Sequence, residues 1–260
     1  MGNKLIGTTS VKLGIYETST DTQLAGMLGD KKEFEDGRVF RLCQNGEVAL
    51  KAGILVQTIA NGSADDSINV ADDASVGDVE VVVDAVTNGE HAVHTLADGY
   101  LVLCVTAGEI GTFYKIKDNT AMTNGNEATI TLYDSLTVAL VGDTSNVSIC
   151  VNPYSGVILD VNTAPLVGVP LIAVDASSST VPVFFWALCE GYGPAQATAA
   201  AITVGDYLKH SGGDVLTWTI VDTSTAGAET ITTYTEAPIG IAATAAASNE
   251  ALIVKYFAMG

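Results

Sequence analysis

Short runs of β-branched and aromatic residues alternate with two-residue turn signals along the chain from residue 38 onward. Asparagine or aspartate followed by glycine readily adopts the positive backbone angles that tight β-hairpins require. Runs of this kind, interrupted at short intervals by such pairs, are typical of β-sandwiches and β-barrels. We therefore expect an all-β protein. The turn pairs are Asp36-Gly37, Asn45-Gly46, Asn61-Gly62, Asn88-Gly89, Asp98-Gly99 and Asn124-Gly125.

The strand-like runs cover most of the chain, whose 260 residues fit one large all-β unit or two smaller ones. Two alanine-rich pieces, Ala195–Ala201 and Ala242–Ala247, lack a 3.6-residue apolar stripe, so each is either a helical turn or a tightly packed strand or loop. The expected strands are Arg38–Cys43, Val48–Ile59, Val79–Val86, Tyr100–Thr106, Thr112–Lys117, Ala128–Tyr133, Val147–Val151, Gly156–Val161, Val167–Val174, Val181–Glu190, Asp214–Val221, Glu229–Tyr234 and Ala251–Phe257.

Charge divides the chain into two parts. The protein has 30 acidic against 11 basic residues, a net charge of −19, which argues against binding nucleic acid through a basic field. Residues 1–51 hold seven basic and seven acidic residues, whereas no Lys or Arg occurs in residues 52–114 or 118–208. Either the near-neutral N-terminal part lies against a partner while the acidic body stays solvated, or the chain simply has an acidic surface.

The cysteines and the apolar runs bear on location. Cys43, Cys104, Cys150 and Cys189 each lie in an apolar context without C-x-x-C spacing, and we expect four buried free thiols, as suits a reducing cytoplasm. The longest apolar run, Val181–Cys189, is far shorter than the roughly 20 residues of a membrane helix. No membrane association and no secretory signal are expected.

Residues able to carry catalysis or bind a metal are scarce. His91 and His94 are three residues apart in a strand-like run and would point to opposite faces, unlike a zinc-binding pair. His210 has no nucleophile motif to serve, and no phosphate-binding loop occurs. The acidic pairs beginning at Asp65 and Asp72 lack the alternating ligands of a calcium loop. We therefore expect no catalytic residues, metal or cofactor. A pair of carboxylates for glycan hydrolysis remains the enzymatic alternative.

Several stretches, in order along residues 28–257, resemble bacteriophage virion proteins, above all the head decoration (cement) proteins that coat a capsid lattice. These stretches of the chain have glycines where strands enter or leave turns, as a small curved barrel needs. The stretches are Leu28–Asp30, Asp36–Arg41, Ala49–Gln57, Phe113–Asn119, Ile130–Asp134, Asn152–Ile158, Val167–Val169, Phe185–Gly193, Val204–Leu208 and Ile239–Ala242.

The resemblance implies a domain plan. In compact decoration proteins the strand corresponding to Ala52–Val56 runs almost directly into the one corresponding to Val167–Val169, whereas here the segment from Asn61 to Asn152 intervenes. We therefore expect a small β-barrel or β-sandwich with an inserted second β-domain and an extended N-terminal arm. The expected ranges are 1–30 for the arm, 31–60 with 153–260 for the barrel, and 61–152 for the insertion.

The resemblance also implies a function. We expect a non-enzymatic cement protein on the outside of a phage head, assembled in the bacterial cytoplasm, with the major capsid protein as its partner. The apolar run in Val181–Trp186, which has apolar side chains on both strand faces, favours a homotrimer. The alternative is a head- or tail-fibre base or an adhesion protein whose acidic insertion binds a host-surface glycan.

A contact surface follows from the charge division. The near-neutral N-terminal part carries basic and apolar residues close together, and this combination suits docking against the capsid or a neighbouring subunit. The residues expected to make the contact are Lys31, Lys32, Phe34, Arg38, Val39, Phe40 and Arg41. The arm is expected to become ordered only on binding, with the insertion facing outward.

Overall fold

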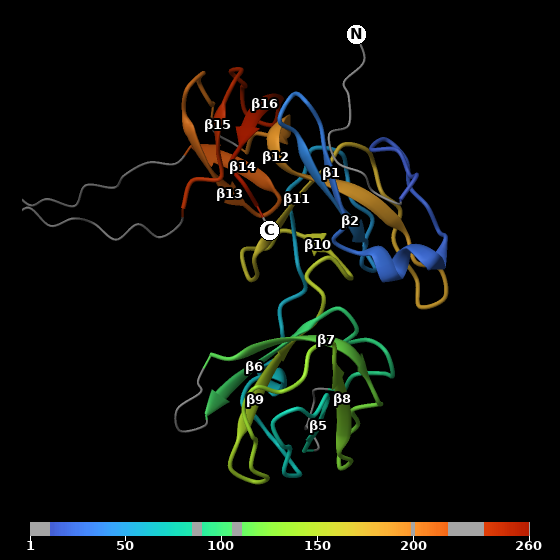
Figure 1. The fold of residues 1–260 in the computed structure, drawn as a ribbon. Coiled ribbons are helices and arrows are strands. Elements are labelled where there is room, and N and C mark those ends of the chain that lie inside the picture. Colours follow the sequence, from blue (N-terminus) through green and yellow to red (C-terminus); the bar gives the residue numbers. More distant parts are fainter. Residues whose placement is uncertain (1–10, 85–89, 106–110, 199–200, 218–236, 260) are drawn as a thin grey trace, which may run out of the picture. The chain divides into compact units, whose positions relative to one another are not determined.

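The computed structural model describes residues 11–84, 90–105, 111–198, 201–217 and 237–259 (Figure 1). The chain divides into two compact units. One, the discontinuous unit, joins Met1–Ile59 to Tyr154–Gly260; the other, the inserted unit, is Ala60–Pro153. Among the described residues the only helical segments are two short 3-10 helices, η1 (Thr22–Met27) and η2 (Ser63–Asp65). The expected all-β class is confirmed.

Ten strands among the described residues form one sheet in the discontinuous unit, in the order β10-β3-β11-β12-β16-β15-β13-β14, with β1 and β2 continuing from β12. They are β1 (Lys31–Glu33), β2 (Val39–Gln44), β3 (Val56–Gln57), β10 (Ile158–Leu159), β11 (Leu166–Pro170), β12 (Phe184–Gln196), β13 (Tyr207–Ser211), β14 (Asp214–Thr217), β15 (Gly240–Ala242) and β16 (Ala251–Tyr256).

Strand β12 is long enough to serve two parts of this sheet. Its first half pairs with β2 and β11, and its second half, from Gly191 to Gln196, pairs with β16. A register shift between Leu188 and Glu190, followed by Gly191 at φ 97°, lies where the halves meet, and such a bulge bends a strand. Ala197 then bridges to Val215 in β14, so β12, β16, β15, β13 and β14 close into a small barrel.

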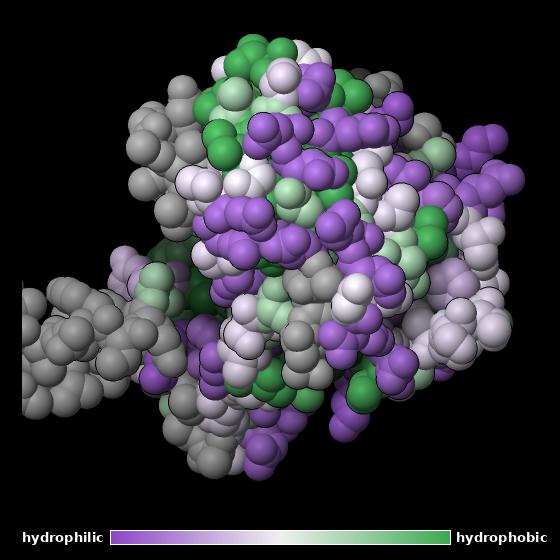
Figure 2. All heavy atoms as spheres, turned by 90° about the horizontal axis from the view of Figure 1, so that it is seen from below, coloured by the Kyte–Doolittle hydropathy of each residue, from purple (hydrophilic) through white to green (hydrophobic). Residues whose placement is uncertain are grey.

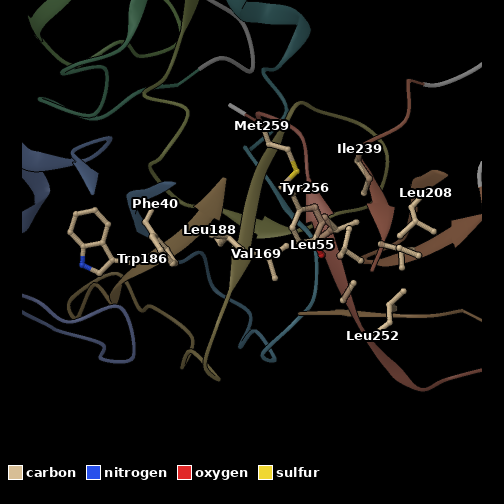
Figure 3. Close-up of a cluster of buried hydrophobic side chains, with 14 of the residues drawn as sticks. Phe40, Leu55, Val169, Trp186, Leu188, Leu208, Ile239, Leu252, Tyr256 and Met259 are labelled. Atoms are coloured by element: carbon tan, nitrogen blue, oxygen red, sulfur yellow. The ribbon is translucent and has the colours of Figure 1, made fainter. Parts of the chain in front are cut away.

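Both faces of the first half of β12 are buried within the chain. Phe184, Trp186 and Leu188 belong to one core, whereas Phe185 and Ala187 belong to another that is formed with β3 and β11. Figure 3 shows the first core, with Trp186 and Leu208 at opposite ends in this view. The two apolar faces led us to expect a homotrimer. That argument was wrong, because the chain itself covers both faces.

Residues 11–30 correct a second expectation. They are no extended arm. Val11 is only 4 % exposed, and the partly buried Leu13 and Ile15 pack against the core that contains Trp186. The Trp186 Nε1 donates to the Leu13 carbonyl (2.9 Å), and Ser19 and Phe184 exchange two backbone hydrogen bonds. The alternation Val11, Leu13, Ile15 signals a half-buried extended segment. Residues 1–10 of the expected arm lie outside the described residues.

The inserted unit is a second barrel with its own core. Hydrogen bonds from Ala71 N to Val82 O (2.8 Å) and from Asp84 N to Asn69 O (2.9 Å) join its two outer strands, so the sheet closes. Alternate residues of its strands, among them Leu101, Ile116 and Ile130, are fully buried. The strand order is β4-β9-β6-β7-β8-β5, with β4 (Ile68–Asn69), β5 (Glu80–Val83), β6 (Tyr100–Val105), β7 (Phe113–Asn119), β8 (Ala128–Leu132) and β9 (Asn146–Cys150).

Most expected strands overlap observed ones, with two kinds of error. The expected strand Val48–Ile59 shrinks to β3, and four short strands, β1, β4, β13 and β15, lie in stretches where no strand was expected. The described parts of both alanine-rich pieces contain no helix. The expected strand Glu229–Tyr234 lies outside the described residues. β1, β4 and β15 escape sequence patterns because two or three residues cannot establish a period. β13 has five residues, but its burial does not alternate regularly.

Candidate functional site

The expected contact residues lie on the hairpin formed by β1 and β2, and two of its basic side chains form ion pairs within it. The Lys31 Nζ lies 2.7 Å from a Glu33 carboxylate oxygen, and the Arg38 Nε lies 2.6 Å from Asp36. The Arg41 guanidinium donates to the Gly29 carbonyl at 2.9 Å. The hairpin therefore presents a polar, near-neutral surface rather than a basic one.

Two of the seven expected contact residues are buried, which corrects that expectation. Lys32 and Phe40 are direct partners in the β1–β2 register and face inward, 7 % and 0 % exposed. The Lys32 amine donates to the Leu13 carbonyl and lies 4.2 Å from the Trp186 ring centroid. Burial lowers the pKa of Lys32, and the nearby Glu17 charge partly opposes this. Lys31, Phe34, Arg38, Val39 and Arg41 remain at least partly exposed.

Each of the three histidines is paired with an aspartate. His91 Nε2 lies 2.8 Å from Asp65 and His94 Nδ1 lies 2.7 Å from Asp118, both in the inserted unit. In the discontinuous unit, His210 Nδ1 lies 3.0 Å from a carboxylate oxygen of the fully buried Asp160. The other Asp160 oxygen accepts from the Asn162 amide at 2.9 Å. The Asp160 side chain thus joins the turn at Asn162 to β13.

His210 also lines a cavity of about 370 Å³. The described residues lining it include no serine, threonine or cysteine, so the His210–Asp160 pair has no nucleophile there to activate. They are Pro165, Leu166, His210, Ala237, Pro238, Ile239, Phe257, Ala258 and Met259. The pair joins β10 to β13, and its geometry accounts for a structural role.

We expect Asp160→Ala to destabilise the discontinuous unit by about 2–4 kcal/mol, because it leaves His210 and the Asn162 amide without their acceptor. Asp118→Ala is the matched control: it removes the exposed partner of His94, and solvent-exposed pairs contribute little. Urea denaturation of both variants measures the difference. Equal stability of the two variants would contradict this assignment.

The cysteines differ from the expectation in one respect. All four are free thiols, but only Cys43 and Cys189 are buried, whereas Cys104 and Cys150 are partly exposed on the inserted unit. Burial raises the pKa of Cys189 to about 12 and that of Cys43 well above its ordinary value. The Cys104 Sγ lies 2.8 Å from the Ser148 hydroxyl. The error arose because outward positions of β6 and β9 also carry apolar side chains.

Two carboxylates of the acidic run that starts at Asp65 make hydrogen bonds within the inserted unit. Asp65 pairs with His91, and Asp73 accepts from the Gly142 amide at 2.8 Å. Asp72, Asp73, Asp78 and Glu80 line a cavity of about 440 Å³. Within the described part of the chain, no three His, Cys, Asp or Glu side chains are grouped as metal ligands would be.

A second surface, which the sequence reasoning missed, lies on the outer face of the inserted unit. We call Tyr100, Phe113 and Tyr133 the aromatic surface. The rings of Tyr100 and Phe113 stack with centroids 4.9 Å apart and planes 22° apart, and Phe113 is 59 % exposed. Lys115 lies 5.5 Å from the Tyr133 ring and 2.9 Å from Asp98, and this hydrogen bond raises the pKa of Lys115.

The aromatic pair borders a cavity of about 220 Å³. The other described residues that line the cavity mix apolar and hydrogen-bonding groups, and none of these residues is basic. They are Asn61, Asp66, Val102, Ser148, Ile149 and Cys150. The signal that could have found this site is the alternation in β6 and β7, where Tyr100 and Phe113 occupy positions out of phase with the buried Leu101 and Tyr114. Aromatic residues at such outward positions indicate a binding surface.

On the face that Figure 2 shows, hydrophobic residues occur in small groups between hydrophilic ones. None of the helices in the described residues has the length and apolarity needed to cross a membrane. Fold and surfaces together define an all-β protein of two units, one inserted into a loop of the other. Comparison of the chain with protein-family models, curated proteins and solved structures gives no match.

Proposed function

We propose that this is a non-enzymatic virion protein that decorates a phage head, binding the major capsid protein across capsomers as a homotrimer on the capsid exterior. The observation that supports this best is the β1–β2 hairpin. Among the described strands β1 pairs only with β2, so it lies at the edge of the sheet described, and Lys31 and Arg38 are each paired with a carboxylate. An outer strand can add to a neighbour's sheet, and pre-paired charges lower the cost of docking.

The proposed work is mechanical and needs no reactive group. Many copies, each held by weak contacts, would resist internal pressure through multivalency. A single exposed charge at such a rim contributes on the order of 0.5–1 kcal/mol, so single substitutions should have small effects. The acidic remainder of the chain, net −19 overall, would keep the decorated particle soluble.

We expect the triple variant Lys31→Ala, Arg38→Ala and Arg41→Ala to lower occupancy on purified phage heads strongly while the protein stays folded. Lys117→Ala, an exposed lysine on the inserted unit, is the control and should bind as the unchanged protein does. Occupancy is read by gel densitometry and by density in particle reconstructions. If the triple variant bound phage heads at normal occupancy, the β1–β2 hairpin would not be part of the interface.

The inserted unit offers the complementary test. Strands β3 and β10 are antiparallel neighbours, so residues 60–153 can be replaced by an Asn-Gly turn. We expect this shortened chain to fold and to bind heads. If it folds but no longer binds, the inserted unit is the one that docks, and the orientation proposed here is reversed.

A second candidate function is supported by the aromatic surface. A fibre-base or adhesion protein that binds a host-surface glycan would need exposed aromatic side chains with polar groups at their rim. Tyr100, Phe113 and the cavity beside them provide both on the inserted unit. The two functions are compatible, because one uses the discontinuous unit and the other the inserted unit.

A further inference from the structure

Phe113 lies where folding alone does not favour a large apolar ring. It is on the outer side of β7, and its neighbour Tyr114 points into the barrel core. One ring face packs on Tyr100, while more than half of the side chain remains exposed. The register places Val102 directly between Phe113 and Ser148 on the adjoining strands. The sheet therefore holds a flat apolar platform in a fixed orientation.

Hydrogen-bonding groups stand at the edge of this platform. Among the described residues no partner is recorded for the Asp66 carboxylate, which lines the same cavity. Asn61 is held in place by a hydrogen bond from its Nδ2 to the Ile149 carbonyl (3.1 Å). The Ser148 hydroxyl accepts from the Ser67 amide at 3.0 Å. A ligand would thus meet an apolar face on one side and a strong acceptor on the other.

This combination selects the chemistry of the ligand. A sugar ring has an apolar face of C–H groups and an edge of hydroxyls that donate to a carboxylate. The cavity, about 220 Å³, is smaller than the roughly 300–1,000 Å³ of clefts for drug-sized ligands, so it suits a single ring. Lys115 is the nearby cation and is already paired with Asp98. A protein of net charge −19 repels anionic glycans.

We propose that the cavity beside Tyr100 and Phe113 binds one neutral sugar residue of a glycan, with the ring stacked on Phe113 and a pair of hydroxyls donating to Asp66. Bidentate donation to a carboxylate gives orientation, and stacking supplies most of the affinity. This inference rests on the second candidate function. It is independent of the docking surface on the β1–β2 hairpin.

The test uses the full chain on an array of neutral oligosaccharides built from glucose, galactose, mannose and their N-acetylamino forms, with uronate-containing oligosaccharides as the anionic set. We expect binding to at least one neutral oligosaccharide and none to the anionic set. Titration calorimetry should then show Phe113→Ala about tenfold weaker, while Phe113→Tyr retains affinity. Asp66→Asn should weaken binding, since the amide accepts less strongly.

Tyr192→Ala, which removes an equally exposed aromatic ring from the discontinuous unit, is the matched control and should leave affinity unchanged. If an oligosaccharide binds but Phe113→Ala has no effect, the adhesion function stands and this site is wrong. If none binds, both are wrong. Self-association that disappears in Phe113→Ala, without glycan binding, would assign the surface to a second copy of the chain and overturn the proposal.

Discussion

Trp186→Ala is expected to destabilise the discontinuous unit strongly while the stability of the inserted unit is unchanged. Trp186 is almost fully buried, its Nε1 donates to the Leu13 carbonyl, and its ring packs against the Lys32 ammonium. Removing a buried tryptophan costs about 3–5 kcal/mol, a large share of the roughly 5–15 kcal/mol by which domains are stable. Loss of the Trp186 side chain also frees residues 11–15 from their contact with it. The buried ammonium group of Lys32 would then border a cavity.

Scanning calorimetry and limited proteolysis measure this effect separately in the two units. The inserted unit should keep its own transition, because its core shares no residue with the core around Trp186. Tyr192→Ala is the control on the same strand, half-exposed, and should change stability by no more than about 0.5 kcal/mol. Loss of both transitions in Trp186→Ala would show that the units do not fold independently.

Stability of the discontinuous unit is expected to fall steeply as the pH rises above 9. The buried Cys189 has its pKa raised to about 12 from an ordinary value of 9, and the pKa of Cys43 is raised in the same way, in both cases chiefly by burial. Above pH 9 the unfolded chain releases these protons, whereas the folded protein retains them. The thiols' contribution is therefore complete below pH 9 and is lost as the pH rises towards the folded pKa.

For Cys189 the free energy of unfolding should fall by about 1.4 kcal/mol per pH unit once the pH is well above 9, and Cys43 should add a decrease in the same direction. Urea denaturation at several pH values measures the slope. The double variant Cys43→Ala with Cys189→Ala should show a smaller slope of stability against pH. The difference from the unchanged protein is then the contribution of the two thiols, separate from any contribution of Tyr256 and Lys32. Cys104→Ala with Cys150→Ala, the two partly exposed thiols, is the control. If the variant that lacks both buried thiols kept the slope of the unchanged protein, the prediction would be wrong.

The sequence predicted the all-β class because turn pairs and β-branched runs are local signals. It also placed strands β5 to β9 of the inserted unit, and in β5, β8 and β9 buried and exposed positions alternate with a period of two. The N-terminal segment shows where local signals mislead. Its threonines and serines suggested a solvated arm, yet three alternating apolar residues, Val11, Leu13 and Ile15, are enough to hold it against Trp186.

The errors at the contact surface have the same origin. Lys32 was assigned to the surface because it is charged, but its strand position opposite Phe40 turns it inward. Tertiary pairing of β1 with β2 decides this, and a three-residue strand gives no period from which to read it. The aromatic surface was missed for a related reason, since Tyr100 and Phe113 meet only when β6 pairs with β7.

The place of the inserted unit in the chain has a consequence for how the protein is made. Its residues, 60–153, are contiguous, so all of its strands leave the ribosome before β10 does. Strand β2, in contrast, must wait for β12, its main partner, which is encoded some 140 residues later. During translation the inserted unit can therefore be complete while β2 and the segment that covers Trp186 are still without their partners. Until β12 emerges, these N-terminal apolar residues are the part of the nascent chain most exposed to aggregation and to chaperones.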